Sequence, residues 1–246
     1  MSLRAARRAV ALGFALVVCV LRYWSMRLRG PITLEQRAQW LQSASRTVLA
    51  SLGIQYRVEG EPPSEGIVVA NHLSYLDIAI FSAIMKCFFV AKAEISRWPY
   101  FGEAARSGGT LFVDRSSITS AESVAAEIGE RLALPVPVLF FPEGTSTDGS
   151  SVLRFHSRLF EPAIQAGAPV TAAAIRYVLA DGSEERDLCW FGDETFLPHL
   201  WKTLGTVGFI AEIRFGEPRV YSHRRDAADQ TREEVVAMRE SNLVLR

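Results

Sequence analysis

The segment Asn71–Asp77 carries the residues of this chain whose types and spacing best suit chemistry. It follows the apolar run 67–70, which predicts a short buried strand, and the apolar residues after Asp77 predict a helix that enters a core. His72 would then lie at a strand-to-helix junction, where catalytic groups of α/β proteins gather. Asp77 can return after about one helical turn to hold one ring nitrogen of His72. The other nitrogen would be free to take a proton from a substrate hydroxyl.

The same residues also have a purely structural interpretation. Asn71 and His72 could cap the helix and satisfy backbone groups of its first turn. A histidine followed five residues later by an aspartate does not by itself separate the two interpretations. The rest of the chain favours the catalytic one.

Three further motifs follow in order along the chain. They are Gly108-Gly109-Thr110-Leu111-Phe112-Val113-Asp114-Arg115, Phe141-Pro142-Glu143-Gly144-Thr145-Ser146, and Ala168-Pro169-Val170-Thr171, which opens an apolar strand. Together with the first segment they resemble the four motif blocks of the glycerolipid acyltransferases, the lysophosphatidate acyltransferase-like proteins. The resemblance extends over residues 50–220, and four blocks in the right order are more specific than any one of them.

The resemblance implies that His72 and Asp77 form a catalytic pair, the histidine as general base and the aspartate fixing its tautomer. It also implies that the second block binds the phosphate of the acceptor through Arg115, since an arginine can fork onto phosphate oxygens. The structural alternative is a surface ion pair between Asp114 and Arg115.

By the same resemblance, Glu143 and Thr145 help to bind the acceptor, and Gly144 lets the backbone approach it. The full set of expected substrate-binding residues is Asn71, Arg115, Glu143, Gly144 and Thr145.

The implied reaction moves a fatty acyl chain from a thioester, acyl-CoA or acyl carrier protein, to the free hydroxyl of a lysolipid. The chain has no Gly-x-Ser-x-Gly nucleophile elbow, so direct attack in a ternary complex is favoured over an acyl-enzyme. No bound cofactor and no metal are expected. Two other classes remain open: a catalytically inactive lipid-binding protein, disfavoured by the intact His72 and Asp77, and a thioesterase, disfavoured by Arg115 and the Glu143 block.

The head group of the acceptor is the open point. Lysophosphatidate acyltransferases commonly continue the third block with an arginine, where this chain has Ser146. His156 or Arg158 could supply the missing charge, or could simply begin a solvated helix. Residues 191–199 resemble the branch that acts on lyso-ornithine lipids. The first expectation is 1-acylglycerol-3-phosphate as acceptor and phosphatidate as product, and the alternative is a lyso-ornithine lipid.

Composition limits the possible partners. At 246 residues, of which 49% are hydrophobic, the chain can form one domain with an appendage. A formal net charge of zero argues against a nucleic-acid partner recognised by bulk charge. The cysteines Cys19, Cys87 and Cys189 have neither disulfide nor zinc spacing, which predicts buried thiols in a reducing compartment.

The N-terminal segment predicts a membrane anchor. Residues 9–21 are continuously apolar or small and are flanked by arginines, and Arg22-Tyr23-Trp24 is typical of an interface. The anchor could be a short span or a helix in one leaflet, and the alternative is a buried core helix. The expected location is the inner membrane with the catalytic domain on its cytoplasmic face.

A second helix is expected over 33–52. Thr33 and Gln36 suit a capping box, and Gly53 suits a helix end. With the first helix it would form a membrane-associated hairpin, so the expected division is an anchor over 1–52 and an acyltransferase domain over 53–246.

The remaining pattern alternates strands and helices, which predicts a single α/β domain with a mostly parallel or mixed central sheet flanked by helices. Expected strands cover 54–58, 66–70, 87–91, 110–113, 136–141, 170–177, 188–191 and 207–215. Expected helices cover 75–85, 99–106, 117–133, 158–166, 196–204 and a segment from 226 onward.

Overall fold

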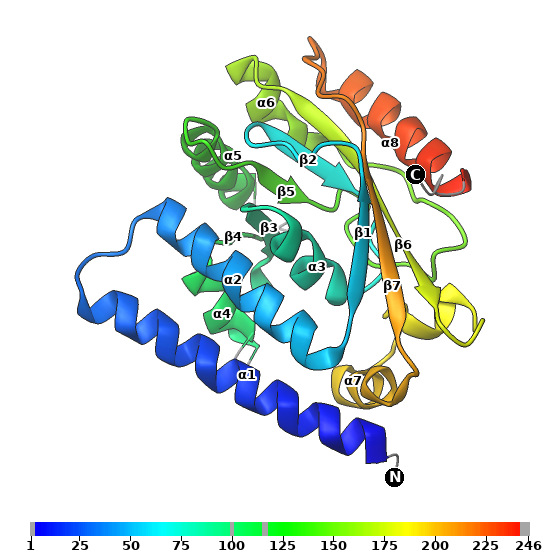
Figure 1. The fold of residues 1–246 in the computed structure, drawn as a ribbon. Coiled ribbons are helices and arrows are strands. Elements are labelled where there is room, and N and C mark those ends of the chain that lie inside the picture. Colours follow the sequence, from blue (N-terminus) through cyan, green and yellow to red (C-terminus); the bar gives the residue numbers. More distant parts are fainter. Residues whose placement is uncertain (1–2, 99–100, 115–117, 242–246) are drawn as a thin grey trace.

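The computed structural model describes residues 3–98, 101–114 and 118–241 (Figure 1). Its α-helices are α1 (Leu3–Leu28), α2 (Leu34–Leu52), α3 (Leu76–Ile84), α4 (Phe101–Ser107), α5 (Ile118–Leu132), α6 (Glu161–Ala166), α7 (Phe196–Gly205) and α8 (Arg224–Glu240). Its strands are β1 (Gln55–Glu59), β2 (Ile67–Ala70), β3 (Phe88–Lys92), β4 (Leu111–Val113), β5 (Val138–Phe140), β6 (Val170–Leu179) and β7 (Phe209–Phe215). Short 3₁₀ helices are η1 (Ala93–Arg97), η2 (Ser157–Phe160) and η3 (Glu185–Leu188).

The strands form one seven-stranded mixed sheet in the order β1-β7-β6-β2-β5-β3-β4. All strand pairs are parallel except β6 with β7. Strand β2 lies at the centre and is fully buried, as expected for an apolar run between parallel neighbours. The expected α/β fold with a mixed sheet is confirmed. The carboxyl end of β2, where a ligand-binding crevice is expected, leads directly to His72.

Two hydrophobic cores cover the two faces of the sheet. Because side chains alternate along a strand, Val68 and Ala70 of β2 enter one core and Ile67 and Val69 enter the other. The first core contains residues of α1, α2, α3 and α7, and the second contains residues of α5, α6 and α8 (Figure 1). The segment after β2 is therefore fixed between two packed layers.

One expected strand lies at the edge of the sheet and another does not form. The strand expected over 54–58 is β1, which pairs with β7 and is exposed at every residue. The strand expected over 188–191 is wrong. The chain there leaves η3 as an irregular segment, and the backbone N–H of Trp190 donates to the carbonyl of Leu73 instead of a neighbouring strand.

Helix α2 begins and ends as expected. The backbone N–H of Gln36 donates to the Thr33 hydroxyl at 3.2 Å, and the Gln36 side chain accepts from the Thr33 N–H at 2.9 Å. Gly53 ends the helix with φ of 70°. The inner face of α2 packs on α3, where the Arg46 Nε donates to the carbonyl of Ala83 at 2.7 Å. The apolar stripe of α2 is thus a packing face.

Helix α1 is 26 residues long, twice the apolar stretch that predicted it. It is the one helix of the described chain that is long and apolar enough to cross a membrane. Its contacts run along its whole length. Near its start, Arg8 Nη1 donates to the carbonyl of Thr206 at 2.7 Å, just after α7, and further along, Trp40 Nε1 of α2 donates to the carbonyl of Cys19 at 3.1 Å. All three cysteines are free and buried, as expected.

Candidate functional site

His72, in the loop between β2 and α3, lies beside Asp77, in the first turn of α3. The Nδ1 atom of His72 is 2.8 Å from Oδ2 of Asp77. The same oxygen accepts backbone N–H groups from Leu73 at 2.7 Å and Ser74 at 3.1 Å. Asp77 is completely buried, so its carboxylate is held among donors and away from water. The expected contact between the two side chains is present.

The imidazole of His72 is partly exposed. The ring of His72 stacks on Phe141 with centroids 4.1 Å apart and an angle of 10° between the planes. Its side chain is 18% exposed. The second ring nitrogen, Nε2, makes no hydrogen bond to any residue that the structure describes. With Nδ1–H donating to Asp77, the Nε2 lone pair can accept a proton.

The structural interpretation of this segment as a helix cap is wrong. The N-cap of α3 is Tyr75, without a side-chain cap. The Asn71 side chain is buried and pairs with Ile175 of β6, donating to its carbonyl at 3.0 Å and accepting from its N–H at 2.9 Å. Both polar atoms of Asn71 thus fix the end of β2 to β6.

Glu143 holds the backbone of the loop that carries His72. Its Oε1 accepts the N–H of His72 at 2.8 Å, and its Oε2 accepts the N–H of Leu153 at 2.7 Å. The side chain is buried, and this burial raises the pKa of the Glu143 carboxyl, opposed by the two backbone donors. The carbonyl of His72 accepts the N–H of Thr147, the residue after the third block, at 2.9 Å, so His72 is bonded twice to this part of the chain.

The other expected binding residues occupy different positions. Gly144 has φ of 80°, a conformation that favours glycine, and Thr145 is exposed beside it. Gly144 is half-buried, and both residues follow Glu143 in the loop joined to His72. Arg115 lies outside the described residues. His156 and Arg158 are exposed, and the backbone N–H of His156 donates to the carbonyl of Pro142.

The segment that follows η3 packs against the His72 loop. Trp190 donates its N–H to Leu73 at 2.8 Å and accepts at its carbonyl from the hydroxyl of Ser146. The Tyr75 hydroxyl is 3.1 Å from Nδ1 of His199, in α7. The region whose sequence resembles the lyso-ornithine branch therefore lies beside the motif blocks.

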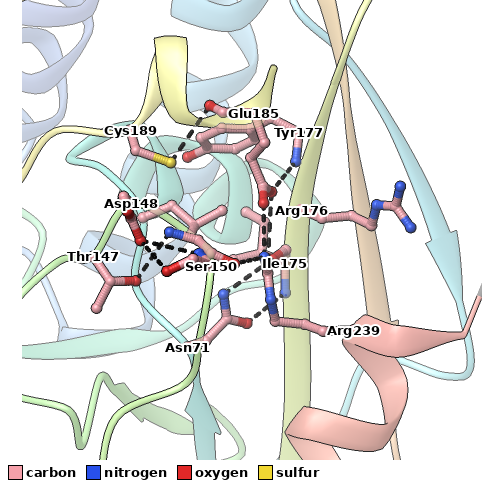
Figure 2. Close-up of polar contacts among 12 residues, drawn as sticks. Asn71, Thr147, Asp148, Ser150, Ile175, Arg176, Tyr177, Glu185, Cys189 and Arg239 are labelled. Carbon is pink, nitrogen blue, oxygen red and sulfur yellow. Dashed lines mark hydrogen bonds and ion pairs between the residues drawn. The ribbon is translucent and has the colours of Figure 1, made fainter.

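One residue that no sequence motif indicates touches the pair directly. The hydroxyl of Tyr177, in β6, donates to Oδ1 of Asp77. The backbone N–H of Tyr177 donates to Glu185 Oε1 at 2.7 Å, and Glu185 is paired with Arg239 of α8 at 2.7 Å (Figure 2). No motif signals Tyr177, because it is one aromatic residue in an apolar strand.

Comparisons with known proteins give the same class. A family model described as Acyltransferase matches residues 55–176. A lyso-ornithine lipid O-acyltransferase of Pseudomonas aeruginosa is 36% identical over 237 residues, 94% of this chain and 88% of the relative. A 1-acyl-sn-glycerol-3-phosphate acyltransferase of Neisseria meningitidis is 40% identical over 147 residues, 58% of this chain and 57% of the relative. The crystal structure of the 1-acyl-sn-glycerophosphate acyltransferase PlsC of Thermotoga maritima has a TM-score of 0.68 at 20% identity, covering 97% of both chains.

The fold, the four blocks and these matches define an enzyme that transfers acyl groups in lipid biosynthesis. The chain belongs to the glycerolipid acyltransferase family, as its sequence motifs predicted.

Proposed function

We propose that this chain transfers a fatty acyl chain from an acyl thioester to the free hydroxyl of a lysolipid, with His72 as general base. The observation that carries the proposal is the state of the imidazole: Asp77 holds Nδ1, while Nε2 has no partner among the described residues. As the hydroxyl oxygen attacks the thioester carbonyl, Nε2 takes its proton. When the carbon–sulfur bond breaks, the imidazolium returns this proton to the thiolate.

Asp77 contributes by stabilising the imidazolium that forms in the first step. Glu143 and Asn71 contribute through backbone contacts, since the polar atoms of both side chains are bonded to backbone groups. We therefore propose that these two residues position the loop, whereas Gly144, Thr145 and Arg115 are the candidates for contact with the acceptor. The donor is acyl-CoA or an acyl carrier protein thioester.

For the acceptor we propose a lyso-ornithine lipid. Ser146 stands where an arginine is common. Its hydroxyl donates to the carbonyl of Trp190, so this side chain holds the neighbouring segment and supplies no cation for a phosphate. The relative that aligns with 94% of this chain is named for that acceptor. Lysophosphatidate is the second candidate, supported by the Neisseria relative and by the block that ends at Arg115. The sequence motifs alone favoured lysophosphatidate as the first candidate and lyso-ornithine lipid as the second.

Parallel kcat/KM measurements on the two acceptors test this assignment. We expect the wild type to use lyso-ornithine lipid more efficiently than lysophosphatidate. Ser146→Arg should raise kcat/KM for lysophosphatidate by about 10- to 100-fold, the effect of a charge-assisted contact worth about 1.5–3 kcal/mol. Ser151→Arg, an equal change at an exposed position, is the control.

Two other outcomes would contradict this proposal. A wild type that prefers lysophosphatidate, and that loses about 10- to 100-fold in kcat/KM when Arg115 is changed to Ala, would assign the phosphate acceptor instead. Label that passes from the thioester only into free fatty acid would indicate a thioesterase.

We further propose that α1 lies in one leaflet of the inner membrane, with the catalytic domain on the cytoplasmic face. One stripe of α1 packs on α2 and α7 along the length of the helix, so the helix cannot cross the bilayer without drawing polar parts of the domain into it. The other side is apolar and exposed, with Val10, Phe14, Val17, Leu21, Trp24 and Leu28. Such a face suits burial at the level of the lipid head groups. The division into an anchor over 1–52 and a catalytic domain over 53–246 remains part of this proposal.

Charges placed on this face should release the protein from membranes. In the triple variant Phe14→Glu, Leu21→Glu and Trp24→Glu, the stripe that packs on the domain is unchanged, so the fold should persist. Each lost apolar side chain removes roughly 1.5–3 kcal/mol of burial. We expect the protein to move from the pelleted membranes to the supernatant. Val220→Glu, at another exposed apolar residue, is the control. Full membrane retention of the folded triple variant would disprove the anchor.

A further inference from the structure

The carboxylate of Asp77 receives four hydrogen bonds, and they are divided between its two oxygens. Oδ2 accepts from His72 Nδ1 and from the backbone N–H groups of Leu73 and Ser74. Oδ1 accepts from the hydroxyl of Tyr177, which lies 100 residues further along the chain. Among the described residues, Tyr177 is the one side chain besides His72 that bonds this carboxylate. Both oxygens are therefore held, and rotation of the carboxylate plane would break contacts at each end.

Tyr177 is suited to remain a donor at every physiological pH. Its ring is buried and packs on Phe209 with centroids 5.1 Å apart. Burial, and then the negative charge of Asp77, raise the pKa of the Tyr177 phenol well above its usual value. A buried carboxylate needs such donors to stay ionised away from water.

The position of Tyr177 is itself fixed from the C-terminal helix. Glu185 accepts the N–H of Tyr177 and is held by the Arg239 guanidinium, which also donates to the carbonyls of Ile175 and Gly149 (Figure 2). These contacts hold Tyr177 in a fixed position relative to Asp77. The strand that carries the phenol is thereby pinned on both sides, by Asn71 through Ile175 and by α8.

We propose that Tyr177 is a positioning residue for the proposed base, acting on His72 through Asp77. Its hydroxyl fixes the plane of the carboxylate, so that the Oδ2 lone pair points at Nδ1 and Nε2 is presented to the acceptor hydroxyl. It also draws charge from the carboxylate, which limits how strongly Asp77 favours the imidazolium. This inference rests on the proposed role of the His72–Asp77 pair and adds a third side chain to it.

The sign of the effect on pH dependence follows from this geometry. Only the unprotonated imidazole can act as a base. Loss of the Tyr177 hydroxyl leaves more negative charge on Asp77, which favours the imidazolium, so the acidic limb of the kcat/KM profile moves to higher pH. The other ionisable groups around the His72–Asp77 pair are Glu143, Tyr177, Glu185, Cys189 and Arg239.

Tyr177→Phe in the full chain tests the proposal. We expect kcat to fall about 10-fold, which is less than the roughly 100-fold that a positioned general base contributes. The KM for thioester and lysolipid should stay within about two-fold, since the Tyr177 side chain is buried. The acidic limb should move up by about half a pH unit. Tyr221→Phe removes a phenol hydroxyl from the other face of the sheet and should leave kcat and the profile unchanged.

A second substitution covers the case in which the phenylalanine variant fails to fold. A fluorinated tyrosine at position 177 keeps the ring and the hydrogen bond but donates more strongly. The acidic limb should then move to lower pH, opposite to the change in Tyr177→Phe. If the acidic limb of the kcat/KM profile lies at the same pH in the folded variants as in the wild type, the proposal is overturned, even if the melting temperature falls. His72→Ala, measured in parallel, separates the role of His72 as base from the role of Tyr177 in positioning it. If His72→Ala stays active, the proposed mechanism itself fails.

Discussion

Replacing His72 by alanine should lower acyl transfer by about 100-fold or more and leave the fold intact, because a positioned general base contributes roughly that factor. Among the described residues, the imidazole makes one side-chain hydrogen bond and one stacking contact. The contacts that hold the loop, to Glu143 and from Thr147, use the backbone of residue 72 and survive the change. Asp77 also keeps three of its four donors.

The measurement is transfer of labelled acyl groups from a thioester into lipid by purified protein, with thermal melting as the check of folding. His223→Ala is the matched control, since His223 is exposed at the start of α8 and its side chain makes no capping hydrogen bond. Near-normal turnover in folded His72→Ala would exclude His72 as the base.

Asp77→Asn should cause a loss of similar size, together with a loss of stability. The amide has one acceptor oxygen, whereas the carboxylate accepts at both oxygens. Whichever way the amide is turned, its NH₂ group faces a donor. A variant with normal stability and normal activity would show that the two hydrogen-bonded sides of Asp77 are dispensable.

Local sequence was sufficient to predict the pairing of His72 with Asp77. A short buried strand followed closely by a helix leaves few ways to place two residues five apart, one after the strand and one in the first turn of the helix. The capping box of α2 was predictable for the same reason, because Thr33 and Gln36 are neighbours in the chain. Features of this kind depend on backbone geometry within one turn.

Contacts between distant segments were not predictable in this way. Glu143 meets His72 across 71 residues and Tyr177 meets Asp77 across 100, and neither pairing leaves a periodic signal. The apolar residues near Trp190 suggested a strand, yet their backbone partner is the loop at Leu73. Helix α1 continues beyond its apolar run at both ends, and Arg8, before that run, bonds carbonyls at the end of α7. Each of these outcomes depends on which parts of the fold become neighbours.

Glu143→Gln should lower both activity and stability, by about 10- to 100-fold in kcat and by about 1–3 kcal/mol in the free energy of unfolding. Glu143 now accepts two backbone N–H groups, one on each oxygen. A glutamine can accept only one of them, and its NH₂ group then faces the other donor. Either the loop of His72 or the segment of Leu153 must move, and a displacement of about 1 Å at a catalytic base can cost a factor of 100.

Kinetic constants and melting temperature together distinguish positioning from acceptor binding. If Glu143 positions His72, kcat falls, the KM for the lysolipid stays constant, and the melting temperature drops by about 2–4 °C per kcal/mol lost, as expected for a chain of this size. If Glu143 contacts the acceptor, as the family resemblance implied, the KM for the lysolipid rises and the melting temperature stays near that of the wild type. Glu212→Gln is the control, since Glu212 is a largely buried acid of β7 that pairs with Arg57 and Arg176. It should lower stability without a specific loss of kcat, because its partners are surface arginines and not the backbone that carries the base.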